Sequence, residues 1–122
     1  MDDGIWRFEA FRRAYQLSLV LHRASLGWPK VEQYGGVADQ LRRASKSVCA
    51  LLIEGNGRRP GSLAEYGRYL MMAVASADEA RLWCNYAADL EYVPSATARD
   101  WQAELSGIAR MLQAVRANLS EP

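Results

Sequence analysis

The sequence predicts an all-α protein, a single antiparallel up-down bundle of four helices that forms one domain over residues 1–122. Apolar residues recur at steps of three and four in four separate segments, which is the spacing of one helix face. Glycine or proline interrupts the chain between these segments. Strand-like alternation is absent from the sequence, so the helices are expected to pack on one another. A chain of 122 residues can bury a core of its own without disulfide bonds or metal.

The first helix is expected over residues 6–25. Its apolar row is widened by neighbouring alanine and leucine residues, and consists of Phe8, Phe11, Tyr15 and Leu19. Gly27-Trp28-Pro29 ends the helix, because proline cannot continue one. The loop that follows, about ten residues long, exceeds the usual connection between bundle helices.

The second helix is expected over residues 37–54. Its core side consists of Val37, Leu41, Ala44, Val48 and Leu51. The run Gly55-Asn-Gly57 comes next, and glycine readily adopts the left-handed conformation that ends helices. We therefore expect this helix to stop after Glu54.

The third helix is expected over residues 63–91 and the fourth over residues 97–119. Ser62 and Glu65 have the spacing of a capping box, in which each side chain satisfies a free backbone amide at a helix start. Tyr92-Val-Pro94 ends the third helix, whose core row consists of Leu63, Tyr66, Leu70, Ala73, Ala77, Ala80 and Cys84. The fourth has the most regular apolar row of the chain, formed by Trp101, Leu105, Ile108, Leu112, Val115 and Leu119.

A strip of polar residues borders the core side of the second helix. It consists of Gln40, Arg43, Ser47 and Glu54. Glu54 has the unfavourable charge for a helix C-terminus, and a cation would offset this. One interpretation is a partly buried ion network of Arg43, Glu54 and Glu79 that links the second and third helices. The alternative is that Glu54 is a solvated surface carboxylate.

The second helix also resembles a known family. The pattern Gln-x-x-Arg-Ala-x-x-Ser-(Ile/Val), then Glu-Gly-x-Gly-Arg, is similar to the signature of the bacterial four-helix-bundle proteins named for ribosomal RNA intervening sequences. That family includes the accessory protein of diversity-generating retroelements. Here the pattern is formed by Gln40, Arg43, Ala44, Ser47, Val48, Glu54, Gly55, Gly57 and Arg58. Matches continue at Trp28-Pro29, Glu32, Tyr34-Gly35, Leu70, Ala73, Ser76 and Glu79, so the resemblance extends from about Phe8 to Leu119.

The resemblance implies self-assembly, because relatives form ring-shaped homo-oligomers, typically pentamers. Its retroelement members resemble nucleic-acid binders. Three positions depart from the family pattern. Leu51 stands where relatives usually have Asn, Ile53 where they have Ala, and Ala75 where they have Gly. Any role of that Asn is therefore absent here.

The second and third helices carry more apolar surface than one core needs. Two such residues, Cys49 and Ile53, lie opposite the core row of the second helix. On the third helix a second apolar face contains Met72, Trp83 and Tyr86. We expect these five residues to form an interface between subunits. The alternative is a wide core covered by aromatic rings.

Charge is nearly balanced, at +1, but it is unevenly placed. Between Gln40 and Arg59 there are five basic residues and one acidic residue, Glu54. Between Asp78 and Glu104 most of the charged residues are acidic. Such segregation can join subunits head to tail. The basic residues Arg42, Lys46, Arg58 and Arg59 could instead form one patch that binds RNA or DNA weakly and non-specifically. A net charge of +1 weighs against nucleic-acid binding as the main purpose.

Nothing in the sequence encodes catalysis, and no catalytic residue, cofactor, metal site or small-molecule substrate is expected. His22 is the only histidine and has no evident nucleophile or metal partner. The cysteines Cys49 and Cys84 lie in apolar patterns and are expected to be reduced thiols of a cytoplasmic protein. No apolar run is long enough for a membrane span. We therefore predict a non-catalytic, self-assembling scaffold that presents a surface to a macromolecular partner. The alternative is a nucleic-acid-binding accessory factor.

Overall fold

The computed structural model describes residues 3–119. Within this part of the chain, the long helices are α1 (Glu9–Ser25), α2 (Val37–Arg58), α3 (Leu63–Asp89) and α4 (Ser95–Ala117). Two short 3-10 helices, η1 (Asp3–Arg7) and η2 (Lys30–Glu32), precede α1 and α2. The described residues contain no strand, which confirms the all-α prediction.

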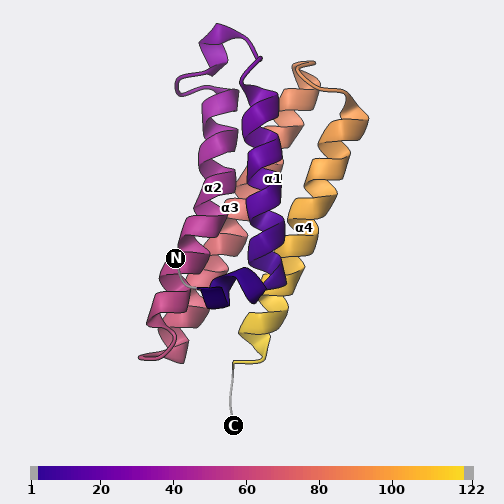
Figure 1. The fold of residues 1–122 in the computed structure, drawn as a ribbon. Coiled ribbons are helices and arrows are strands. Elements are labelled where there is room, and N and C mark those ends of the chain that lie inside the picture. The colour runs from indigo at the N-terminus through magenta and orange to yellow at the C-terminus, as the bar shows by residue number, and fades with distance from the viewer. Residues whose placement is uncertain (1–2, 120–122) are drawn as a thin grey trace.

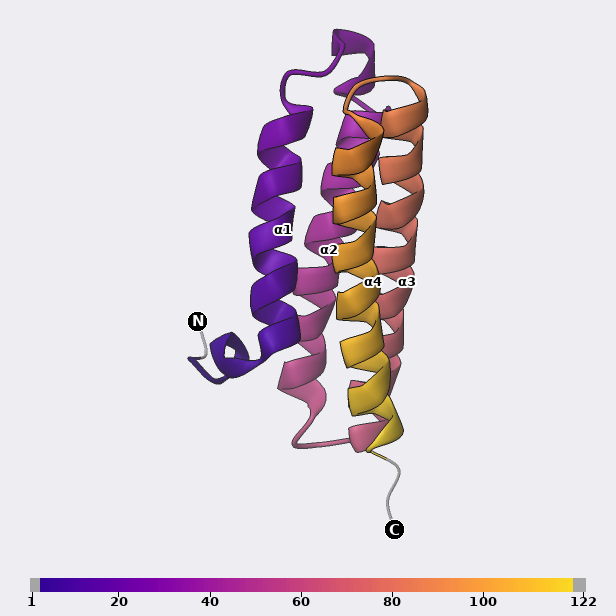
Figure 2. The same ribbon diagram turned by 90° about the vertical axis from the view of Figure 1, so that its right-hand side faces the viewer.

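Consecutive helices run antiparallel and pack side by side, and α4 returns to lie beside α1 (Figures 1 and 2). The contact between α2 and α3 is the most extensive, and the contact between α1 and α4 is the smallest of the four helix-to-helix contacts. The α2–α3 turn and the end of α4 lie at the lower end of Figure 1, where η1 crosses below α1. The α1–α2 and α3–α4 loops lie at the upper end.

The core side of α1 differs from the predicted row. Phe11 is buried, but Tyr15 is exposed, and the neighbouring small and aliphatic residues Ala10, Ala14, Leu17 and Leu21 face the core. The sequence pattern also merged η1 with the first helix, which begins only at Glu9. Phe8 has an extended backbone that separates the two. The ring of Trp6 in η1 then packs edge-on against both Phe11 and Tyr15.

The predicted helix stop at Gly55 is wrong. Helix α2 continues to Arg58, so Gly55 and Gly57 are both helical. A Cβ atom at residue 55 would lie 2.8 Å from the Cβ atom of Tyr69 on α3, whereas one at residue 57 would meet nothing within 4 Å. Gly55 is therefore required for the close approach of α3 and not for a turn.

The turn itself comes later. The amides of Gly61 and Ser62 donate to the carbonyl of Arg58. Helix α3 then starts at the predicted cap, where the hydroxyl of Ser62 accepts from the amide of Glu65 at 3.1 Å. Only this half of the predicted capping box is formed, because the Ser62 amide donates to Arg58 and the Glu65 carboxylate pairs with Arg68. Its predicted core row is confirmed from Tyr66 to Cys84, although Leu63 is exposed.

Glu32 joins the two loops at the opposite end of the bundle. Its carboxylate accepts from the hydroxyl of Tyr92 at 2.6 Å and from the amide of Val37 at 2.8 Å. These bonds, led by that of Tyr92, hold the pKa of Glu32 below its usual value. A Cβ atom at Gly36 would collide with Glu32, and Gly35 has a positive φ of 79°. The loop conformation thus depends on both glycines.

An ion pair joins α1 to α4, which share the smallest contact between neighbouring helices. The guanidinium of Arg13 donates through Nε and Nη2 to the two carboxylate oxygens of Glu104, each at 2.8 Å. A Cβ atom at Gly107 would lie 3.0 Å from Arg13 Nη2, so this glycine leaves room for the guanidinium. The bond to Arg13 lowers the pKa of Glu104.

Alanine substitutions at the two helical glycines of α2 should act in opposite directions. Gly55→Ala forces α2 and α3 apart and should lower the free energy of unfolding by about 1–3 kcal/mol. Gly57→Ala adds a methyl group in open space and should raise it by about 0.5–1 kcal/mol, because alanine favours the helix. Urea unfolding of both variants measures this difference. Equal effects would contradict the close approach.

Removal of the Arg13–Glu104 pair should cost stability that depends on pH. Because the folded-state pKa of Glu104 lies below its ordinary value, the contribution is present at neutral pH and is lost as pH falls through that pKa. Glu104→Gln should lower the free energy of unfolding by about 0.5–1 kcal/mol at pH 7, since both side chains are about one-third exposed.

The cost of the same Glu104→Gln variant should be smaller near pH 3 than at pH 7, because protonation of Glu104 removes the ion pair from the parent protein. Asp78→Asn is the control, because Asp78 pairs with Arg81 on its own helix. An equal cost of Glu104→Gln at both pH values would show that the lost ion pair is not its cause.

Candidate interaction surfaces

The α2–α3 face is a mixed apolar and polar surface. It consists of Arg43 and Ser47 of α2 with Met72, Ser76, Glu79, Trp83 and Tyr86 of α3. The hydroxyls of Ser47 and Ser76 lie 3.0 Å apart and fix the register of the two helices here. Met72 and Tyr86 are exposed, with 48% of Tyr86 accessible. Met72 and Tyr86 of the predicted second face therefore lie at the surface, whereas Trp83 is partly buried against the core.

The aromatic part of this face is ordered by its own contacts. Trp83 Nε1 donates to Glu79 Oε2 at 3.1 Å, and the rings of Trp83 and Tyr86 lie 5.4 Å apart. Leu82 and Leu90 extend the apolar area and are about half exposed. Leu90 belongs to the predicted second face of the third helix, whereas Leu82 was not predicted to lie there. A signal was present, because α3 carries apolar residues all around its circumference.

The expected ion network of Arg43, Glu54 and Glu79 is not formed. Arg43 Nε instead bonds Asp39 Oδ1 at 3.1 Å, one turn earlier on the same helix, and the Arg43 side chain is 74% exposed. Glu79 bonds Trp83, and Glu54 is exposed. The alternative interpretation, a solvated Glu54, agrees with this geometry.

The remaining strip residue, Gln40, also stays near its own helix start. Its amide lies at 3.5 Å from the carbonyl oxygen of Gly35. Asp39 accepts from the amide of Gly35 at 2.7 Å, and this bond, followed by those of Arg43, lowers the pKa of Asp39. A partner that is four residues away on the same helix is easily reached, so Arg43 does not need to cross to α3.

Cys49 and Ile53 lie on a different surface, the α1–α2 face, which also contains Tyr15, His22 and Lys46. Lys46 Nζ lies 3.0 Å from His22 Nδ1, which places this side of α2 next to α1. Ile53 follows Lys46 by seven residues and so lies on the same side of α2. Cys49 is half-buried, whereas Ile53 and Tyr15 are partly exposed, at 36% and 37%. The five predicted interface residues are thus divided between two faces that flank α2.

The four predicted basic residues are also divided. Arg42 donates to Ser25 Oγ at 2.7 Å and to Gln33 Oε1 at 3.0 Å, which ties the α1–α2 loop to α2. Lys46 is one turn further along. Arg58 and Arg59 lie at the other end of α2, roughly 24 Å from Arg42 at 1.5 Å per residue. One continuous patch of all four is therefore not formed within a subunit.

A basic end remains, formed by Arg58, Arg59 and Arg68. The guanidiniums of Arg58 and Arg68 lie 4.8 and 5.1 Å from the centre of the Tyr69 ring. Arg59 lies over Tyr66 at 5.2 Å. Arg68 also pairs with Glu65 at 3.3 Å. Arg68 was not among the predicted basic residues. It lies on α3, and the tight α2–α3 turn brings it close to Arg58.

The two thiols and the His22 imidazole lie where burial shifts their pKa values. Burial raises the pKa of the Cys49 thiol to about 11 and of the Cys84 thiol to about 12, so neither is a thiolate at neutral pH. Burial and then the nearby Lys46 lower the pKa of His22. No group of side chains that could hold a metal occurs within residues 3–119. Over the same range, no helix has the length and apolar character of a membrane span.

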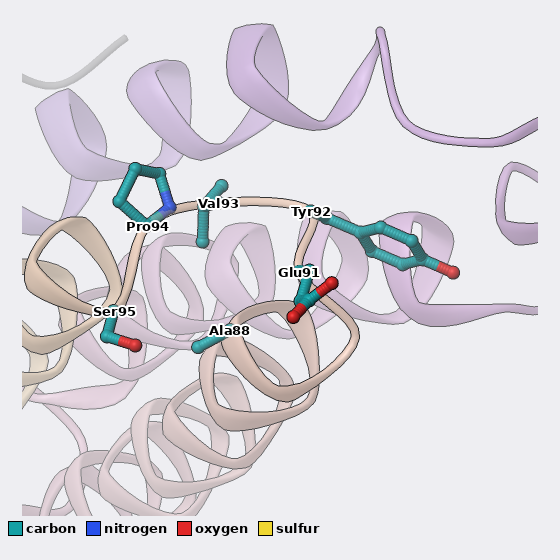
Figure 3. A pocket seen from close by; sticks show the side chains of 6 residues that line it. All are labelled: Ala88, Glu91, Tyr92, Val93, Pro94 and Ser95. Carbon is teal, nitrogen blue, oxygen red and sulfur yellow. The ribbon is translucent and has the colours of Figure 1, made fainter.

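An open hollow of about 410 Å³ lies beside the α3–α4 loop (Figure 3). Its lining consists of Ala88, Glu91, Tyr92, Val93, Pro94 and Ser95. Glu91 and Ser95 provide its polar side chains, while the Tyr92 ring points away in Figure 3 and bonds Glu32.

Comparisons with known proteins agree with the fold and the resemblance. The chain is similar to a protein of unknown function from the S23 ribosomal protein family of Bacteroides thetaiotaomicron, whose crystal structure matches with a TM-score of 0.76. The match covers 88% of this chain and 97% of the other at 14% identity, which shows the fold alone. No curated protein matches the chain. The family model described as "23S rRNA-intervening sequence protein" matches residues 7–114. Because this match covers nearly the whole length, the chain belongs to the 23S rRNA-intervening sequence protein family.

Proposed function

We propose that this protein is a non-catalytic scaffold that assembles into a closed homo-oligomeric ring and presents its surface to a macromolecular partner. The observation that carries the proposal is the pair of exposed apolar surfaces on either side of α2, the α1–α2 face and the α2–α3 face. They differ in composition, so they suit a head-to-tail contact in which one face meets the other face of the next subunit.

Charge supports the same pairing. The α1–α2 face carries Lys46, whereas the α2–α3 face carries the carboxylate of Glu79 next to Trp83 and Tyr86, and the Arg43 of that face is already paired with Asp39. Opposite charges at the rim of an apolar contact favour one docking orientation over others. A contact built in this way repeats from subunit to subunit until the rotation closes.

The geometry of the bundle favours a small ring. Adjacent sides of a four-helix bundle stand roughly at right angles, because each helix contacts two neighbours. Two interfaces at about that angle close a ring of about four or five subunits. The pentamer implied by the sequence resemblance lies in this range. The two free thiols, Cys49 and Cys84, are in keeping with a reducing compartment, for which we propose the cytoplasm.

A second candidate function is nucleic-acid binding at the basic end. The observation that favours it is the stacking of Arg58 and Arg59 on tyrosine rings, which fixes two cations at the surface. Their repetition around a ring would add avidity that one subunit lacks. Such binding is expected to be weak, non-specific and dependent on phosphate contacts.

The head-to-tail arrangement can be tested with one variant on each face. Ile53→Asp on the α1–α2 face and Tyr86→Asp on the α2–α3 face should each give monomers, because an unpaired carboxylate in an apolar contact is costly. Native mass spectrometry measures the oligomer, and circular dichroism verifies that helicity is retained. The parent protein should be larger than a dimer, and a parent that stays monomeric at micromolar concentration would contradict the ring.

Mixing the two variants gives the sharper result. Each retains one intact face, and the intact faces are complementary, so the mixture should form one-to-one heterodimers that do not grow further. In a twofold contact between identical faces, one variant would dimerise by itself and the mixture would form no heterodimer. That outcome would exclude the head-to-tail arrangement.

The basic end can be tested by charge reversal in the full chain. Arg58→Glu with Arg59→Glu should weaken binding of a labelled single-stranded RNA or DNA by about tenfold or more at low salt. Arg23→Glu with Lys30→Glu, a pair of exposed cations at the opposite end, is the matched control. Fluorescence anisotropy over a range of salt concentrations gives the affinities. Equal weakening by both pairs would contradict a site at the basic end.

A further inference from the structure

A second hollow, of about 340 Å³, lies at the end of the bundle opposite the hollow beside the α3–α4 loop. Four segments meet there: η1, the end of α2, the start of α3 and the end of α4. The apolar part of its lining is formed by Ile5, Phe8, Tyr66 and Val115, of which Ile5 and Tyr66 are buried. The exposed cations Arg7 and Arg59 also line it. The hollow therefore has an apolar floor and a cationic rim, at the lower limit of size for small-molecule sites, about 300 Å³.

Both arginines stand on backbone that is held in place. Helix η1, which carries Arg7, is fixed by the packing of Trp6 on Phe11 and by a bond from Arg12 Nη1 to the Trp6 carbonyl at 2.8 Å. Arg59 follows α2 directly, and its guanidinium lies 5.2 Å from the centre of the Tyr66 ring. The two cations come from opposite ends of the first half of the chain, so the fold and not local sequence brings them together.

The charge around the hollow is unbalanced. None of the described side chains that line it is a carboxylate. Helix α2 presents its carbonyl end here, which repels anions, so any attraction for an anion must come from the two guanidiniums. A guanidinium donates two parallel hydrogen bonds to a phosphate, and two such groups at one rim match the double charge of a phosphomonoester.

We propose that this hollow binds a nucleotide, with its phosphate between Arg7 and Arg59 and its base on the apolar floor beside Phe8 and Val115. The phosphate uses the cationic rim, and the flat base uses the floor, which an inorganic anion would leave exposed to water. The site goes beyond the scaffold function, because it lies within one subunit and needs no ring. It shares Arg59 with the second candidate function, but it predicts a binding pocket for one nucleotide and not a patch that follows a strand.

The test uses calorimetric titration of the full-length protein with adenosine monophosphate. Arg7→Gln and Arg59→Gln should each weaken binding by about tenfold or more, because each removes charge-assisted hydrogen bonds to the phosphate. Arg23→Gln at the other end of the bundle is the control and should bind as the parent does. Circular dichroism shows whether the variants are folded. Arg7→Lys keeps the charge but loses the planar fork, and it should fall between the parent and Arg7→Gln.

Two further ligands separate the parts of the site. Adenosine lacks the phosphate and should not bind measurably, while inorganic phosphate should bind at least about tenfold more weakly than adenosine monophosphate. Phosphate that binds as tightly would overturn the role of the floor. An unchanged affinity in both arginine variants, or no binding by the parent at millimolar ligand, would overturn the site.

The source of the phosphate is determined by competition. A short single-stranded oligoadenylate with a 5′-phosphate that displaces adenosine monophosphate at lower concentration identifies a strand end as the natural ligand. Displacement only at higher concentration identifies a free nucleotide. Both results support the site, provided that Arg7→Gln weakens the competitor as well. Native mass spectrometry of the same samples reports the ring separately, so a failure of one proposal is distinguishable from a failure of the other.

Discussion

The close contact between α2 and α3 is the constraint on which the rest of the structure depends. Gly55 brings the α2 backbone to Tyr69, and further along α3 the fully buried residues Ala73, Ala77 and Ala80 continue the row of small side chains. Helices that approach so closely leave little room for large residues between them. The bulky side chains Met72, Trp83 and Tyr86 therefore lie beside the contact and not inside it.

The two ends of the bundle are closed by different interactions. At the loop end, hydrogen bonds from Tyr92 and Val37 to Glu32 and from Arg42 to Ser25 hold the chain together. At the opposite end, arginines stack on Tyr66 and Tyr69. Arginine can be exposed and still be fixed when its guanidinium lies on a ring. Arg42 at the loop end is thus used in internal bonds, whereas Arg58 and Arg59 at the opposite end are held on rings and stay exposed.

The helices were predictable because their periodicity is local. The start of α3 at Ser62 and the row from Tyr66 to Cys84 follow from spacing alone, and both are confirmed. The role of Gly55 was predicted wrongly because glycine occurs both at helix ends and at close contacts between helices. Only the position of Tyr69 in the structure distinguishes the two roles. The break at Phe8 was missed because η1 and α1 share one apolar row.

The candidate sites were less predictable, because they depend on distances between segments. Arg43 has the spacing to reach α3, yet Asp39 lies one turn away and bonds it first. Arg42 and Arg59 belong to one basic stretch of sequence, but a long helix separates them in space. The hollow between Arg7 and Arg59 joins residues 52 positions apart and has no sequence signature. Basic residues that are close together in a helical sequence therefore do not have to form one patch on the surface.

A twofold dimer and a head-to-tail ring would cover the two apolar faces to different extents. A twofold contact joins two copies of one face, so a dimer would cover either the side of Ile53 or the side of Tyr86 and leave the other in water. Exposed apolar area of this kind favours further association. A head-to-tail contact covers both faces of every subunit at once, but only if the chain of contacts closes. Because α2 lies between the two faces, they meet at a corner of the bundle, and this corner turns each subunit relative to the last. The proposed ring is therefore the closed arrangement that would cover both apolar faces of every subunit.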